Sequence, residues 1–140
     1  MGGFGVVVRV ETSEGVQLAM ECLTKSRFSR PKDRNGLKRK LAVLTTVAPS
    51  PFLLRCHAAF ETGSNIFIVT DLLTGGDLFF RLDEMIDKGR EGFPESQART
   101  LIAEISLGLT HLHNRGFIHR DIKVENIMLN GDGRVKLVDF

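Results

Sequence analysis

The sequence is poor in cysteine, in net charge and in long apolar runs. Its only two cysteines, Cys22 and Cys56, lie in apolar stretches and indicate reduced core thiols of an intracellular protein, with a disulfide as the less favoured alternative. A formal net charge of +2 is too small to indicate a nucleic-acid partner or a membrane surface. No apolar segment approaches the roughly 18 residues that a membrane span requires. The sequence therefore predicts neither a nucleic-acid-binding nor a membrane-spanning protein.

Signals for export or lipid attachment are also lacking. The start MGGFGVVVRV has no charged residue ahead of its apolar part, unlike a signal peptide. Val6 stands where a myristoylation signal needs Ser or Thr. The composition, 42% hydrophobic and 26% charged over 140 residues, is ordinary for one soluble globular domain. We therefore expect a cytoplasmic or nuclear protein.

β-Forming residues dominate the first half of the sequence, with one helix among them. The predicted strands form two antiparallel pairs: VVVRV with VQLAMECL, and LRCHAAFE with NIFIVTDLL. The turn-rich segments ETSEG and TGSN have the length of hairpin connections. The helix, expected from about Lys38 to Val47, follows from apolar residues at three- or four-residue spacing: Leu37, Leu41, Leu44 and Val47.

After residue 76 the pattern becomes helical. DLFFRLDEMIDKG predicts one helix, and FPESQARTLIAEISLGLTHLHNRG predicts a longer one with Pro94 near its first turn and Gly116 just past its end. The expected buried stripe of the longer helix is Ala98, Leu101, Ile102, Ile105, Leu109 and Leu112. A short hairpin, NIMLN-GDG-RVKLVDF, ends the chain. The order of elements predicts an α+β fold with two lobes that meet near residues 70–74.

Three candidate sites carry little weight. The histidines of HLH, His111 and His113, point about 200° apart on a helix and cannot chelate one metal ion. The basic run from Arg27 to Lys40 reads best as a solvated helix flank, with anion contacts or a localisation patch as alternatives. Closely spaced glycines in GGFG (residues 2–5) would let backbone N–H groups approach phosphate oxygens, although a glycine-rich tail would look the same.

The segment HRDIKVEN is the strongest indication of chemistry. It places six polar or charged side chains within eight residues, between a predicted helix and a predicted hairpin, among them His119, Arg120, Asp121, Lys123 and Asn126. A loop that is merely solvated rarely lies between apolar segments such as FI and IML. The dipeptide Asp139-Phe140 follows thirteen residues after Asn126. This pattern indicates a functional loop rather than one that is merely solvated.

Together these motifs resemble the eukaryotic protein kinase family of the Ser/Thr class. HRDIKVEN is similar to the catalytic loop, and VDF to the start of the magnesium-binding D-F-G motif. The motif sequences are most similar to those of the basophilic group that includes the cyclic-nucleotide-dependent and receptor kinases. The resemblance implies a two-lobed, protein-kinase-like α+β fold, with a small lobe of antiparallel sheet plus one helix and only the first part of the helical large lobe. It implies a small lobe over residues 1–71 that lacks its first strand, a hinge at 72–76, and large-lobe elements over 77–140.

The resemblance also implies roles for individual residues. Asp121 would accept the substrate hydroxyl proton, Asn126 and Asp139 would bind magnesium, and Lys123 marks the Ser/Thr class. Thr70 would be the gatekeeper, Asp71 and Leu73 part of the hinge, and Asp77 a neighbour of the ribose. The phosphate loop would be Gly2, Gly3, Phe4 and Gly5, and the residues around adenine would be Val7, Ala19 and Met128. A regulatory stack would consist of Leu44, Cys56, His119 and Phe140.

The stretch LAMECL departs from the family. It matches the strand motif V-A-I-K, with Ala19 at the Ala and Glu21 where the ATP-phosphate lysine should be. No acidic residue lies between Asp33 and Glu61, and Lys40 occupies the position of the glutamate that normally pairs with that lysine. We therefore expect a charge-reversed ion pair between Glu21 and Lys40, with solvent-facing side chains as the alternative.

The resemblance covers the whole chain but only the first half of a kinase domain, so the sequence is interpreted as truncated at both ends. The first interpretation is a fragment of an ATP-dependent kinase that transfers the γ-phosphoryl group to protein Ser or Thr, with ATP and Mg²⁺ as cofactors and a basic motif as candidate substrate. The second is a pseudokinase or regulatory binding module, which the loss of the lysine favours. The third is a partial product without a function of its own.

Overall fold

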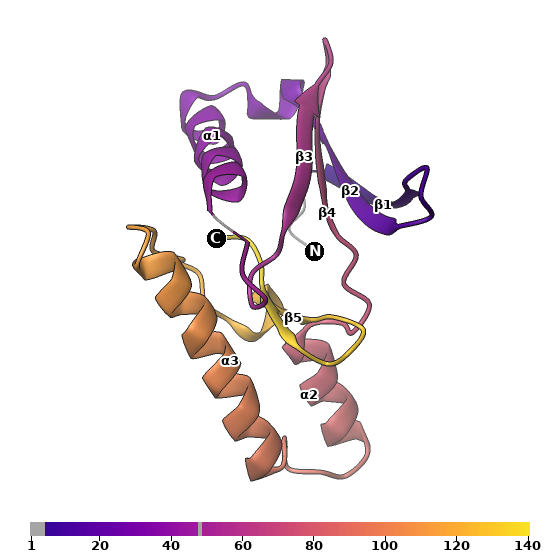
Figure 1. Cartoon of the computed structure of the whole chain (residues 1–140), viewed down its shortest axis with the longest axis vertical. Helices are drawn as coiled ribbons and strands as arrows, with labels where there is room; N and C mark the ends of the chain where they lie inside the picture. The colour runs from indigo at the N-terminus through magenta and orange to yellow at the C-terminus, as the bar shows by residue number, and fades with distance from the viewer. Residues whose placement is uncertain (1–4, 48) are drawn as a thin grey trace. The chain divides into compact units, whose positions relative to one another are not determined.

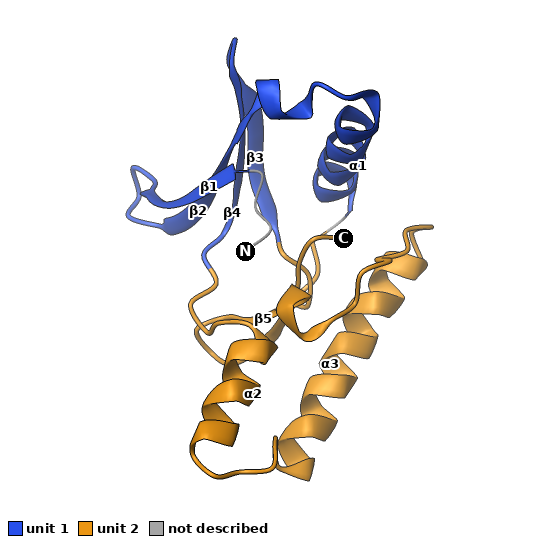
Figure 2. Ribbon diagram, turned by 180° about the vertical axis from the view of Figure 1, so that it is seen from behind, with its two compact units in different colours: residues 1–47, 55–72 blue, residues 48–54, 73–140 orange. Residues whose placement is uncertain are grey.

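The computed structural model describes residues 5–47 and 49–140, and the chain divides into two compact units (Figure 2). Unit 1 comprises residues 1–47 and 55–72, and unit 2 comprises residues 48–54 and 73–140. The short segment before residue 55 therefore clusters with the second unit. The small lobe predicted over residues 1–71 includes this segment, so the bounds of the predicted lobes stay a prediction.

Unit 1 is built on a four-stranded sheet in the order β1-β2-β4-β3, and all neighbouring strands are antiparallel (Figure 1). The strands are β1 (Gly5–Glu11), β2 (Gln17–Thr24), β3 (Cys56–Glu61) and β4 (Asn65–Asp71). The central strands β2 and β4 carry two of the most buried residues, Leu23 and Ile68. In the sheet register, Leu23 pairs with Ile66, and Ile68 pairs with Glu21. The predicted antiparallel sheet is confirmed.

Helix α1 (Pro31–Thr46) lies alongside the sheet and is longer than the sequence suggested (Figure 1). The prediction of a start near Lys38 was wrong because it relied on apolar spacing, which residues 32–36 do not provide. Pro31 begins the helix, where its missing N–H costs no hydrogen bond. The Asp33 carboxylate lies in the first turn, where the positive end of the helix dipole stabilises a negative charge. It also pairs with Arg30 at 2.9 Å. A short 3₁₀ turn, η1 (Lys25–Phe28), precedes the helix.

Unit 2 contains α2 (Leu78–Asp87), α3 (Glu95–His113), the 3₁₀ turn η2 (Val124–Asn126) and a hairpin of β5 (Ile127–Leu129) and β6 (Val135–Leu137). Asp77 caps α2, because its carboxylate accepts a hydrogen bond from the Phe80 N–H at 2.7 Å. Gly116 follows α3 with a φ of 78°, the left-handed conformation common just past helix ends. The helical pattern after residue 76 is thus confirmed.

The hairpin lies at the centre of unit 2. On one side, Leu129 exchanges backbone hydrogen bonds with Gly75 and Gly76, and on the other Leu137 exchanges them with Phe52 and Leu54. Position 75 must be glycine, since a Cβ there would lie 2.6 Å from both the Asn130 oxygen and the Leu129 Cβ. Val135 and Leu137 are fully buried, as is Leu53 at 2% exposure. These contacts explain why residues 48–54 belong to this unit.

The buried face of α3 agrees with most of the predicted stripe. Leu101 and Leu112 are buried and Ala98, Ile105 and Leu109 are half-buried, whereas Ile102 was expected inside but is 62% exposed. Glu104 and Gly108 are buried as well and were not predicted. The helix approaches β6 so closely that a Cβ on Gly108 would lie 2.9 Å from Leu137 Cδ1. The apolar pattern therefore identified most of this face and missed two of its buried positions, because a small and an acidic residue fill them.

None of the helices in the described part of the chain combines the length and apolarity needed to cross a bilayer. The basic residues of α1 are exposed except for Lys40, which agrees with a solvated flank. Cys22 and Cys56 are free thiols, and burial raises the pKa of the Cys56 thiol. A disulfide between them is therefore absent.

Candidate active site

Asn126 fixes the conformation of the loop between α3 and β5. Its side chain is buried, and Nδ2 donates to the backbone oxygen of Asp121 at 2.9 Å and to its Oδ2 at 2.8 Å. Both partners are pure acceptors, so they define the orientation of the amide. The amide oxygen must then face away from Asp121, where it is available to another partner.

Asp121 is an exposed carboxylate held by two neighbours on one oxygen. Lys123 Nζ lies 2.9 Å from Oδ2, which also accepts the hydrogen bond from Asn126. The hydrogen bond from Lys123 lowers the pKa of Asp121, and the same contact raises the pKa of Lys123. Asp121 is therefore ionised at neutral pH, and its second oxygen, Oδ1, has no partner among the described contacts of this carboxylate. An exposed, ionised carboxylate oxygen of this kind can accept a hydrogen bond from a bound group.

The backbone around this loop adopts two unusual conformations. Arg120 and Asp139 have positive φ angles of 67° and 57°, which non-glycine residues seldom adopt. Asp139 follows β6, and the neighbouring Val138 N–H donates to the Asn126 backbone oxygen at 3.1 Å. Asn126 and Asp139 are thereby brought to the same end of the hairpin.

The donor set at this end of the hairpin fits magnesium. Among the described residues, no group of three or more His, Cys, Asp and Glu side chains could hold a metal ion. Mg²⁺, however, commonly takes only one or two protein oxygens and completes its shell with water and substrate phosphates. An amide oxygen from Asn126 and a carboxylate from Asp139 match that requirement.

His119, two residues before Asp121, is a buried ring whose nitrogens make no hydrogen bonds. The ring is 4% exposed, neither ring nitrogen has a hydrogen-bond partner, and the ring meets Phe140 edge-on with centroids 6.1 Å apart. Burial lowers the pKa of His119, opposed in part by nearby backbone groups and by the carboxylates of Asp121 and Asp139. The contact with Phe140 lies within unit 2, and the other predicted members of the stack, Leu44 and Cys56, belong to unit 1, so the complete stack stays a prediction.

We expect the stability of unit 2 to fall as the pH drops below about 6.5, the ordinary pKa of histidine. The unfolded chain binds a proton there that the buried ring of His119 resists, so the stabilisation is present above this value and is lost below it. Replacing His119 with Phe should remove this part of the pH dependence, measured by chemical denaturation at pH 7.5 and 5.5. The matched control is His113→Gln at the exposed end of α3, and an unchanged pH dependence in His119→Phe would contradict the expectation.

The charge-reversed ion pair predicted from LAMECL is confirmed. Lys40 Nζ on α1 lies 3.1 Å from Glu21 Oε2 on β2, and both side chains are partly buried, with 30% and 23% exposure. Glu21 stands between Val7 and Ile68 in the sheet register, so its carboxylate has apolar neighbours. Lys40 therefore supplies the cation that a carboxylate at this position needs.

The other predicted nucleotide residues fall into two sets. In unit 1, the strand pairings place Val7, Ala19, Glu21 and Thr70 on one face of the sheet. In unit 2, Asp77 and Met128 form an isolated backbone bridge. Gly2, Gly3 and Phe4 lie outside the described residues. Gly5 is described, and a Cβ there would lie 2.5 Å from the Cys22 backbone oxygen.

Two further polar contacts were not anticipated from the sequence. His57 Nε2 lies 2.8 Å from Asp71 Oδ1, which joins β3 to the end of β4. Glu104 on α3 accepts hydrogen bonds from the hairpin. A buried carboxylate in an amphipathic helix has no sequence signal of its own. The available indication was Gly108, four residues later, because a glycine inside a helix often marks a close approach by another element.

The family model described as "Protein kinase domain" matches residues 1–140. The chain belongs to the protein kinase domain family. Among curated kinases, ribosomal protein S6 kinase 2 beta of Xenopus laevis is 38% identical over 143 residues, covering 99% of this chain and 22% of the relative. Ribosomal protein S6 kinase alpha-1 of Homo sapiens is likewise 38% identical, covering 99% of this chain and 18% of its own length. The chain thus spans about a fifth of the length of these kinases.

Within a protein kinase domain, Glu21 stands out because the family signature has a lysine on this strand and a glutamate on the following helix. The distance of 3.1 Å shows that this kinase chain keeps the ion pair and reverses its direction. The link between helix and sheet is therefore retained, while the sign of the charge on the strand is changed.

Proposed function

We propose that this chain is part of an ATP-dependent Ser/Thr protein kinase that transfers the γ-phosphoryl group of ATP to protein hydroxyls. The arrangement of Asp121, Lys123 and Asn126 carries the proposal, since an ionised, exposed carboxylate is held in place by a lysine and a buried amide. The likeness to ribosomal protein S6 kinases supports the same class. We further propose an intracellular location and a substrate with basic residues around its Ser or Thr.

Each part of the proposed site has a separate task. Asp121 accepts the proton of the Ser or Thr hydroxyl, whose oxygen forms a bond to the γ-phosphorus while the bond to the bridging oxygen breaks and ADP leaves. Bound magnesium would neutralise charge on the phosphates, and Asn126 and Asp139 are the residues that would hold it. Lys123 pairs with Asp121 and would help to hold its carboxylate in place.

The nucleotide would be held by the residues that the resemblance assigns to it. The loop at residues 2–5 would approach the phosphates through backbone N–H groups. These proposed contacts are Gly2, Gly3, Phe4, Gly5, Val7, Ala19, Glu21, Thr70, Asp71, Leu73, Asp77 and Met128. The strand pairings that place Val7, Ala19 and Thr70 on one sheet face support this assignment for unit 1.

A transfer assay tests the proposal. The chain, and the longer protein that contains it, should phosphorylate a basic Ser/Thr peptide with magnesium and ATP, as detected by mass spectrometry. Chelation of magnesium should abolish the product, and a matched peptide with Tyr at the acceptor position should remain unmodified. A magnesium-dependent product on Tyr alone, or no product from either protein, would contradict the Ser/Thr kinase assignment.

A second function is favoured by Glu21: a regulatory module that binds nucleotide weakly or binds only a protein. A carboxylate on β2 would repel phosphate groups, whereas the intact catalytic-loop geometry would serve no purpose in such a module. Binding of magnesium-ATP without any phosphoryl transfer in the same assay would support this second function.

A further inference from the structure

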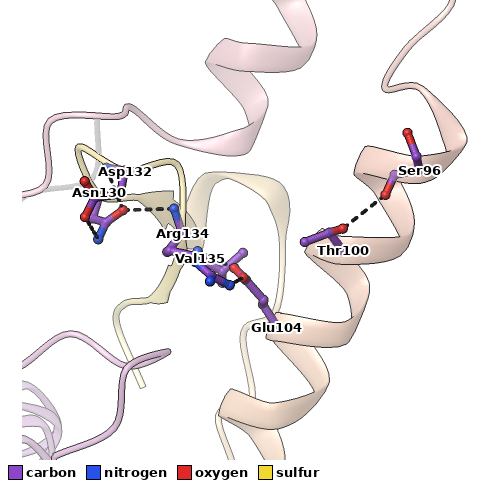
Figure 3. Close-up of polar contacts among 7 residues, drawn as sticks. All are labelled: Ser96, Thr100, Glu104, Asn130, Asp132, Arg134 and Val135. Atoms are coloured by element: carbon purple, nitrogen blue, oxygen red, sulfur yellow. Dashed lines mark hydrogen bonds and ion pairs between the residues drawn. The ribbon is translucent and has the colours of Figure 1, made fainter.

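Glu104 is a buried carboxylate that joins α3 to the β5–β6 hairpin (Figure 3). The residue is 4% exposed, and its two oxygens take different partners on the hairpin. Oε2 accepts from the backbone N–H of Val135 at 2.9 Å, and Oε1 is paired with the guanidinium of Arg134. Without Glu104, the Val135 N–H would lose its acceptor in a fully buried position, which costs more than the hydrogen bond itself gains.

The hairpin turn is organised to present these two partners. Asn130 Oδ1 accepts from the N–H groups of Asp132 at 3.0 Å and Arg134 at 2.9 Å (Figure 3). Gly133 has a φ of 77°, which allows the tight turn. The Arg134 side chain and the Val135 N–H are then the next donors along the chain, and both reach α3. The turn and the carboxylate thus form one continuous set of hydrogen bonds.

The same hairpin carries both proposed magnesium residues. Asn126 immediately precedes β5, Asp139 lies two residues after β6, and the bond from the Val138 N–H to the Asn126 oxygen connects these ends. β6 also packs against α3 through an apolar contact between Gly108 and Leu137, and apolar packing fixes direction less strictly than hydrogen bonds do. A displacement of about 1 Å in such a segment can reduce activity about a hundredfold.

We propose that Glu104 is a positioning residue that holds the hairpin against α3 and thereby sets the placement of Asn126 and Asp139. The part that concerns magnesium rests on the proposed function; the part that concerns the hairpin does not. Arg134 has a lesser role, since its side chain is 65% exposed and its charge is largely solvated.

Two measurements on four variants test this inference. Amide hydrogen exchange reports the hairpin directly, and the magnesium concentration needed for half-maximal ATP binding reports Asn126 and Asp139. The variants are Glu104→Leu, Glu104→Gln, Arg134→Met and Glu95→Gln. Glu95→Gln is the matched control, because it removes a carboxylate from the same helix whose pair with Arg99 is exposed at both partners, 86% and 79%.

Glu104→Leu should speed exchange of the hairpin amides, including that of Val138, about tenfold or more while the amides of α2 keep their wild-type rates. The magnesium midpoint should rise about tenfold. Glu104→Gln keeps an acceptor for the Val135 N–H and should show smaller effects in the same direction, which covers the case that Glu104→Leu fails to fold. Arg134→Met should change both readouts less than threefold, and Glu95→Gln should change neither.

Faster exchange that is uniform across α2, α3 and the hairpin would overturn the proposal, because Glu104 would then support only overall stability. Unchanged hairpin exchange in both Glu104 variants would overturn it as well. If wild-type protein binds no magnesium-ATP, the proposed function fails, and the hairpin exchange still decides whether Glu104 positions this segment.

Discussion

Exchanging the two charges of the reversed ion pair, Glu21→Lys together with Lys40→Glu, should raise the affinity for magnesium-ATP by up to about a thousandfold. A carboxylate about 4 Å from a phosphate charge costs on the order of 4 kcal/mol at an effective dielectric of 20, and each 1.4 kcal/mol changes affinity tenfold. The exchange removes this repulsion and keeps the ion pair that links α1 to β2. Isothermal titration calorimetry on wild type and the double variant measures the change.

The single variants separate repulsion from structural support. Glu21→Gln removes the negative charge and nearly preserves the side-chain size, so it should raise affinity part of the way. Lys40→Met leaves Glu21 without its cation and should lower affinity. A control exchange of the more exposed pair Lys25–Glu61, also in unit 1, should have no effect. The electrostatic interpretation fails if the double exchange gains nothing while each single variant remains folded.

Replacing Asp121 with Asn should reduce the rate of phosphoryl transfer by about 10²- to 10⁴-fold, the range that a positioned general base contributes. The amide cannot take the hydroxyl proton, yet it retains the shape of the side chain, and the backbone oxygen of residue 121 still accepts from Asn126. Binding of magnesium-ATP should therefore be nearly unchanged. Rates of phosphopeptide formation, measured beside calorimetric ATP binding, distinguish the two effects.

The pH dependence gives an independent check on Asp121. Lys123 lowers the pKa of this carboxylate below its ordinary value of 3.8, so the base is ionised throughout the range from pH 5 to pH 8. The transfer rate should consequently show no loss on the acidic side of this range from protonation of Asp121.

For the Asp121→Asn substitution, Asp87→Asn at the exposed end of α2 serves as the matched control and should keep wild-type activity. A similar loss of rate in Asp121→Asn and in Asp87→Asn would contradict the assignment of Asp121 as the proton acceptor.

The sequence predicted the Glu21–Lys40 pair because both charges interrupt regular patterns at positions that the family signature links. The antiparallel sheet and both helices of unit 2 were also predictable, since periodicity of apolar residues reports burial directly. The start of α1 was missed, because its first turns face solvent and contain no apolar repeat. Pro31 and Asp33 were the available signals there.

The role of Glu104 was harder to predict for a physical reason. A carboxylate in a helix reads as solvent-facing, and its burial depends on two donors, Arg134 and Val135, that come from a segment thirty residues later. Gly108 was the weak indication, since a glycine inside a helix often marks a close approach by another element. Likewise, nothing local in residues 52–54 showed that they would pair with β6.

The short distance between Glu21 and Lys40 also restricts how such a pair can arise from its opposite arrangement during evolution. The two residues lie nineteen positions apart in the chain, so a single codon change can alter only one of them. Reversing one alone would place like charges about as close as the present partners, 3.1 Å apart and partly shielded from water. An uncharged side chain such as Gln or Met at one of the two sites would avoid this repulsion at the intermediate step.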